Sequence, residues 1–227
     1  MRAIQRLDDE TRQLHAELEA EHMVLLEATE VSHYQRYLTR AYGFVSPIER
    51  SLLDTPGLSD FVDSRRLRKS ELIEHDLQTT GLKPLEVQSI PQCMWIPWFD
   101  DPHTAIGWAY VVERNTLAFA HLFRHLANVL PGEAAFASSY LKVYAGVSSD
   151  MWRSFCDGVD AVGASQRQVD MMVAGAVSAF RNLRRWRNTL DGKNLSNPHN
   201  EVVAETSAQP PVVEHLVALA EVASEES

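Results

Sequence analysis

Helix-spaced apolar residues run through most of this chain and leave little sequence from which a sheet could form. In residues 165–190 the apolar side chains recur every three or four positions: Val169, Met172, Val173, Ala176, Phe180 and Leu183. That spacing places them on one face of a helix. Alternation of apolar and polar residues, which is typical of half-buried strands, is weak throughout. The pattern therefore predicts an all-α fold.

The same periodicity divides the chain into helices and connections. We expect helices at residues 5–28, 32–53, 60–79, 104–129, 133–145, 148–161 and 165–190, with irregular connections at 54–60 and 80–103. Pro47 can kink or break the second helix, because proline removes a helical hydrogen bond. After residue 191 the composition becomes polar. We therefore predict one helical domain over residues 1–191, followed over 192–227 by a linker and a short amphipathic stretch at 212–223.

Charge and composition exclude several classes of protein. The net charge of −10 disfavours general nucleic-acid binding, which needs a basic surface. No apolar run reaches about 18 residues, so we expect no membrane span, and the first residues lack the apolar core of a secretory signal. Two cysteines are too few for a disulfide scaffold and suit a reducing compartment. We expect a cytoplasmic protein.

A histidine near the start of the chain is the strongest candidate for a metal ligand. His15 lies at the edge of the apolar stripe of the first predicted helix, and Glu19 follows one turn later on the same side. A neutral imidazole binds metal through one ring nitrogen, while a hydrogen bond from the other fixes its orientation. A packed core histidine beside a solvated glutamate is the alternative for the same spacing.

Four segments in order resemble one protein family. They are TRQLHAELE (11–19), GWAYVVERNTLAFA (107–120), YAGVSSDMWRSF (144–155) and the aromatic pair Phe180 and Trp186. Together they span about residues 5–190 and resemble heme oxygenases, most closely the bacterial enzymes that supply biliverdin to phytochromes. The resemblance implies heme between the first helix and the helix at 104–129. It also implies that His15 is the iron ligand supported by Glu19, with His22 as the fallback ligand.

The distal helix departs from the family's pattern. Where the family has Glu-Gly-Ser-x-Leu-Gly-Gly, this chain has Glu113-Arg114-Asn115-Thr116-Leu117-Ala118-Phe119, and all three glycines are replaced. Glycine lets a backbone approach a flat ligand and lets a helix bend. We therefore expect a straighter and stiffer distal helix, with Arg114 and Ala118 on the heme side and Phe119 in the core.

Arg114 has three possible roles. It could fill the pocket and exclude heme, bind an anionic ligand or a heme propionate, or turn to solvent. If it is buried it needs a carboxylate partner, and the adjacent Glu113 points about 100° away on the helix. His121, one turn beyond Ala118, could face His15 and form a bis-histidine heme; a core or surface histidine is the alternative.

Two further groups complete the candidate residues. By the resemblance, Arg181 and Arg184 on the last helix could contact heme propionates; the alternative is a solvated basic face. A diiron site, as in other proteins of this fold, would draw on carboxylates and histidines of several helices. The residues available for it are Glu71, Glu74, His75, Asp76, His121 and His125.

Together these observations favour a divergent heme-oxygenase-like protein. We expect it to contact heme or a related tetrapyrrole through His15, with oxygenase turnover disfavoured by the replaced glycines. The first alternative is an active heme oxygenase that cleaves heme to biliverdin, carbon monoxide and iron, using an external electron donor and serving a phytochrome-type partner. The second is a heme-free interaction protein or a diiron oxidase of the same fold.

Overall fold

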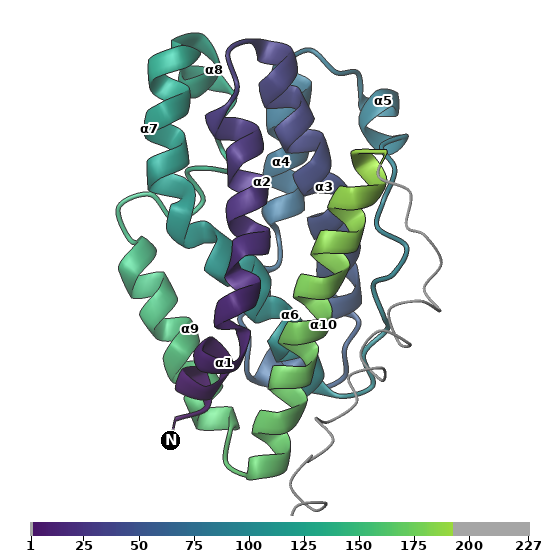
Figure 1. Cartoon of the computed structure of the whole chain (residues 1–227), viewed down its shortest axis with the longest axis vertical. Coiled ribbons are helices and arrows are strands. Elements are labelled where there is room, and N and C mark those ends of the chain that lie inside the picture. The colour runs from purple at the N-terminus through teal and green to yellow at the C-terminus, as the bar shows by residue number, and fades with distance from the viewer. Residues whose placement is uncertain (1, 193–227) are drawn as a thin grey trace, which may run out of the picture.

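The computed structural model describes residues 2–192, and every regular element in that range is a helix (Figure 1). The all-α prediction is confirmed. The α-helices are α1 (Ala3–Thr11), α2 (Ala16–Leu26), α3 (Val31–Leu53), α4 (Lys69–Thr79), α5 (Pro84–Gln88), α6 (Pro102–Asn115), α7 (Phe119–Val129), α8 (Pro131–Phe136), α9 (Ser148–Val162) and α10 (Gln166–Leu190). The linker and the amphipathic stretch at 212–223 lie outside the described residues.

Short 3₁₀ turns modify several predicted helices. The first is divided into α1 and α2 by a 3₁₀ turn over Arg12–His15. The helix expected at 60–79 begins only at Lys69, after two 3₁₀ turns, and the one expected at 133–145 ends at Phe136. Pro47 lies inside α3, which continues to Leu53, so it does not end that helix.

The distal segment is not one continuous helix. α6 ends at Asn115, a 3₁₀ turn covers Thr116–Ala118, and α7 then begins at Phe119. The buried Thr116 hydroxyl donates a hydrogen bond of 2.7 Å to the carbonyl oxygen of Glu113. Such side-chain bonds to the preceding turn disturb regular helical pairing. The expectation of an uninterrupted helix over 104–129 is therefore wrong.

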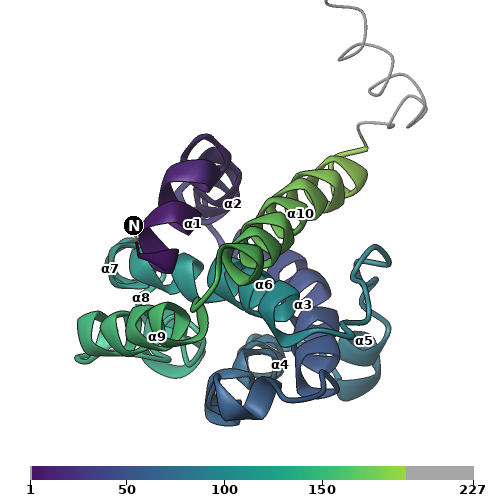
Figure 2. The ribbon, with the colours of Figure 1, turned by 90° about the horizontal axis from the view of Figure 1, so that it is seen from below.

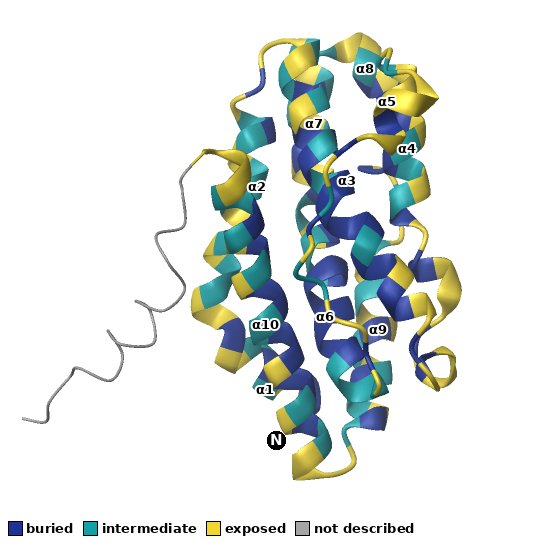
Figure 3. Cartoon of the chain, turned by 90° about the vertical axis from the view of Figure 1, so that its right-hand side faces the viewer, coloured by how far each residue is buried: buried dark blue, intermediate teal, exposed yellow. Residues whose placement is uncertain are grey.

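α6 lies at the centre of the bundle, with the other long helices around it (Figure 2). Its residues from Ala105 to Glu113 are all buried, and the exposed residues gather on the outer faces of the other helices (Figure 3). α6 crosses α10 at very short range. The approach is so close that a Cβ on Gly107 would collide with the carbonyl oxygen of Met172. Likewise, a Cβ on Gly175 would collide with the carbonyl oxygen of Thr104. Glycine at both positions thus lets the two backbones touch.

A membrane-crossing segment is not found in the part of the chain that is described, where every helix is too short or too polar to span a bilayer.

Candidate functional site

His15 lies on the 3₁₀ turn between α1 and α2 and faces α6. Its Nε2 is 3.2 Å from the Thr11 hydroxyl and 3.4 Å from the Tyr110 hydroxyl of α6, and its ring is 5.7 Å from that of Phe180. Partial burial, and then the positive charge of Arg114, lower the His15 pKa below its ordinary value of 6.5. The imidazole is therefore neutral at pH 7, the form in which histidine binds metal.

Glu19 makes no described hydrogen bond to His15. It is exposed on α2, and His15 has its described hydrogen-bond contacts with Thr11 and Tyr110 instead. Thr11 stands one turn before His15, a spacing that could have indicated this contact. Tyr110 comes from a helix 95 positions further along the chain, where it lies one turn before Arg114 on the same face.

Arg114 turns toward α1 rather than to open solvent. Its Nη1 donates to Asp8 Oδ1 at 2.7 Å, and its guanidinium lies 5.9 Å from the centre of the Tyr110 ring. The Tyr110 hydroxyl donates to the same Asp8 oxygen at 3.3 Å. Burial is the main cause that raises the Tyr110 pKa to about 12, so this hydroxyl keeps its proton. We call Asp8, Tyr110 and Arg114 the Asp8 clasp; it joins α1 to α6 beside His15.

The neutral imidazole of His15 is a suitable donor for the iron of a tetrapyrrole. The space next to its Nε2, however, is occupied in part by the Tyr110 hydroxyl. A metal ion binds imidazole nitrogen at roughly 2 Å. Protein atoms on the opposite face of a flat ring lie roughly 3.5 Å from it, at van der Waals contact. Together these distances require roughly 5.5 Å between Nε2 and the atom that faces it. The Tyr110 hydroxyl stands at 3.4 Å and the Thr11 hydroxyl at 3.2 Å, so both must withdraw by roughly 2 Å before a ring can bind at Nε2.

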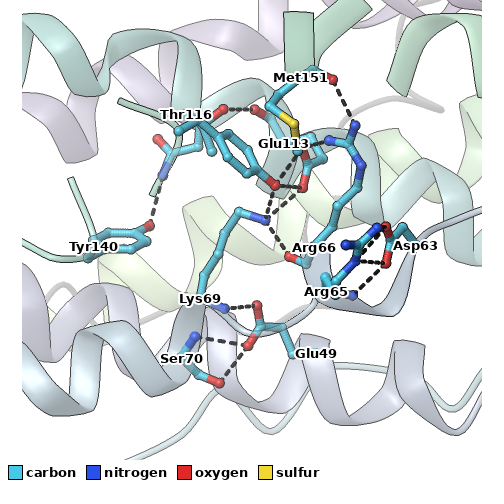
Figure 4. Close-up of polar contacts among 12 residues, drawn as sticks. Glu49, Asp63, Arg65, Arg66, Lys69, Ser70, Glu113, Thr116, Tyr140 and Met151 are labelled. Atoms are coloured by element: carbon cyan, nitrogen blue, oxygen red, sulfur yellow. Dashed lines mark hydrogen bonds and ion pairs between the residues drawn. The ribbon is translucent and has the colours of Figure 1, made fainter. Parts of the chain in front are cut away.

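Glu113, which the family pattern shares, is the centre of a buried ion cluster (Figure 4). Its two carboxylate oxygens accept hydrogen bonds from Lys69 at 2.6 Å, Arg66 at 2.9 Å and Tyr144 at 3.1 Å. The Lys69 side chain is 1% exposed and that of Glu113 is 3% exposed. Burial acts to lower the Lys69 pKa, but Glu113 and Tyr144 outweigh it and the pKa ends above its ordinary value. This cluster holds the end of α6 against the segment that precedes α4.

Glu49 completes the polar centre on the α3 side. Its carboxylate accepts the backbone N–H groups of Lys69 at 2.6 Å and Ser70 at 2.9 Å, and it also accepts the Ser70 hydroxyl. These bonds satisfy donors at the start of α4 that have no partner inside the helix. Burial raises the Glu49 pKa above its ordinary value. Glu49 therefore has a structural role, and sequence reasoning did not identify it.

A small cavity of about 40 Å³ lies behind α6, between α2, α3 and α10. Tyr37, Asn115 and Tyr140 contribute polar groups to a mainly apolar lining. Asn115 links two helices, since its Oδ1 is 2.7 Å from His22 Nε2 and its Nδ2 donates to Tyr140 at 3.2 Å. The Tyr37 hydroxyl is buried without a described hydrogen-bond partner. His22 thus has a bonding role within the fold, away from the clasp.

The remaining candidate residues lie at separate places. Phe119 is buried against Tyr140, with ring centres 4.7 Å apart, as predicted for a core residue. Ala118 is half-buried beside it, and His121 is exposed on α7. Arg181 and Arg184 are exposed on α10, and Arg181 borders an open groove between α1 and α10.

A metal-binding cluster of acidic, histidine and cysteine side chains is not found among residues 2–192. Asp76, a candidate for a diiron site, instead accepts the backbone N–H groups of Ser139 at 2.9 Å and Tyr140 at 2.8 Å. The described residues therefore do not support the diiron alternative.

Comparison with known proteins identifies the family and the fold of this chain. The chain matches the family model for heme oxygenase over residues 1–189. A solved structure of the NO- and CO-bound heme oxygenase from Neisseria meningitidis has the same fold, with a TM-score of 0.70 at 20% sequence identity. The match covers 85% of this chain and 93% of that one. No curated protein matches the sequence. The chain belongs to the heme oxygenase family.

Proposed function

We propose that this protein binds heme or a related tetrapyrrole between His15 and α6, and that oxidative ring opening is slow or absent. The single observation that carries the proposal is the neutral, half-buried His15 imidazole, whose Nε2 points at α6. When bound, heme would supply an iron that accepts this nitrogen. Family membership supports heme as the ligand class.

Slow turnover follows from the side chains on the α6 side of His15, of which Arg114 stands where the family has a glycine. Arg114 and Tyr110 crowd the α6 side of His15, where an oxygen-activating site needs open space beside the ring. Arg114 is also held by Asp8, so a bound ring meets a charged side chain rather than bare backbone. The chain thus retains a candidate iron ligand while the opposite side of the site is filled.

Hemin titration of the purified protein tests this proposal. We expect a saturable Soret band that is lost in His15→Ala and retained in His121→Ala, a matched control at an exposed histidine. Reductant and oxygen added to the loaded protein should leave the Soret band largely in place, without a biliverdin spectrum. Binding that survives in His15→Ala would refute the assignment of the ligand.

An active heme oxygenase is the second candidate, and one observation favours it. The 3₁₀ turn at Thr116–Ala118 interrupts the distal helix even without glycine, so the replaced glycines do not make this segment one continuous helix. Such an enzyme would need an external electron donor and would release biliverdin, which could supply a phytochrome-type partner. Biliverdin formation by the unmodified chain would establish this candidate. A gain of turnover only after Arg114→Gly with Ala118→Gly would instead support the obstructed site.

A further inference from the structure

The contact between Asp8 and Arg114 is incomplete as an ion pair. Only Nη1 of Arg114 bonds to Asp8, and only through one carboxylate oxygen, although a guanidinium can bind a carboxylate through two parallel bonds. The Arg114 side chain is 23% exposed and that of Asp8 is 40% exposed. Because this single bond is partly exposed, Arg114 can readily exchange Asp8 for another carboxylate.

The clasp also occupies the room that a ring beside His15 would need. Tyr110 donates to Asp8, and its hydroxyl stands 3.4 Å from His15 Nε2. Releasing Asp8 removes the acceptor that holds this hydroxyl and frees the guanidinium at the same time. Freeing Tyr110 from its position beside His15 and exposing a carboxylate-binding group are therefore one event.

We propose that Asp8 is a resident carboxylate that holds Arg114 and Tyr110 across the His15 site until a carboxylate of the ligand takes its place on Arg114. This inference rests on the proposed function and adds how the site selects its ligand: Arg114 favours a flat tetrapyrrole whose carboxylate is free over the same ring without one. Arg114 is then a specificity-determining residue, and Asp8 is its internal competitor.

Two ligands and three variants test the exchange. The ligands are hemin and its dimethyl ester, which has the same ring and iron but no free carboxylate. The variants are Asp8→Asn, Arg114→Gln and the control Asp9→Asn, which removes an exposed carboxylate that pairs with Arg12 on the outer side of α1. Asp8 and Arg114 are partly exposed, so we expect all three to fold, as far-UV circular dichroism would check.

We expect Asp8→Asn to bind hemin roughly 1.5- to 5-fold more tightly than the unmodified chain, the range for a partly exposed ion pair. Asp9→Asn should leave the affinity unchanged. Arg114→Gln should reduce the preference for hemin over its ester by a similar factor.

Two outcomes would overturn the exchange alone: Asp8→Asn binds hemin no more tightly than Asp9→Asn, or Arg114→Gln keeps the full preference for hemin. Absence of a His15-dependent Soret band in every variant would overturn the proposed function and the exchange together.

Discussion

Replacing Glu113 by glutamine tests whether the buried ion cluster stabilises the fold. The change keeps the size of the side chain but removes the negative charge that faces Lys69 and Arg66. Lys69, at 1% exposed, then has a buried ammonium group whose nearest carboxylate has been removed. Removing one partner of a buried ion pair typically costs about 3–5 kcal/mol. For a chain of this size that loss corresponds to a melting temperature lower by roughly 6–20 °C.

The effect should depend on pH with a definite sign. In the unmodified protein the Lys69 pKa is raised, so its contribution to stability is lost only as pH rises through that elevated value. In Glu113→Gln, burial dominates and the Lys69 pKa falls below 10.5, so the folded variant prefers neutral lysine. As pH rises towards 10.5 the variant should therefore gain stability, and the deficit should shrink.

Urea unfolding followed by circular dichroism at pH 7 and pH 9.5 measures both effects. Glu71→Gln is the matched control, because Glu71 pairs with Arg68 at the surface, where its side chain is 60% exposed. That control should lose at most about 0.5 kcal/mol. A Glu113→Gln deficit below about 1 kcal/mol, or one that does not shrink at higher pH, would refute the reasoning.

Three further outcomes follow from the packing. Tyr37→Phe removes a buried hydroxyl with no described partner, so the urea midpoint should stay or rise; a clear fall would place a bound water in the cavity beside it. Gly107→Ala should lower the free energy of unfolding by about 3 kcal/mol, seen as a lower urea midpoint, because the added methyl collides with the α10 backbone. In proton NMR the His15 imidazole should titrate below pH 6.5, and Arg114→Gln should raise its pKa, since a nearby positive charge is lost; an unchanged pKa would contradict the position of Arg114.

Local patterns predicted the helices well because each helix buries its own apolar stripe. The break at Thr116–Ala118 escaped prediction, since a single 3₁₀ turn does not interrupt the apolar periodicity on either side. At this position the Thr116 hydroxyl bonds to the Glu113 carbonyl oxygen, in competition with the regular backbone hydrogen bonds of the helix. Composition does not decide which of these bonds forms.

The candidate site also has a part that the sequence predicts and a part that depends on how the helices pack. The sequence indicated that Arg114 needs a carboxylate other than Glu113, and such a partner is present. Its identity as Asp8, 106 positions away, depends on how α1 docks against α6. Glu19 shows that a suitable spacing does not guarantee a contact. It lies one turn after His15, but the described structure contains no hydrogen bond between them.

The glycine contacts between α6 and α10 have a mechanical consequence. With backbone against backbone at Gly107 and Gly175, these helices have no side-chain layer that could be compressed or rearranged between them. They should move as one rigid body, as closely packed elements do. Any widening beside His15 that moves backbone, beyond the withdrawal of side chains, would then come from displacement of α1, and the 3₁₀ turn at Arg12–His15 is the natural hinge. His15, the candidate iron ligand, is thus part of the hinge that would have to bend before a tetrapyrrole could enter.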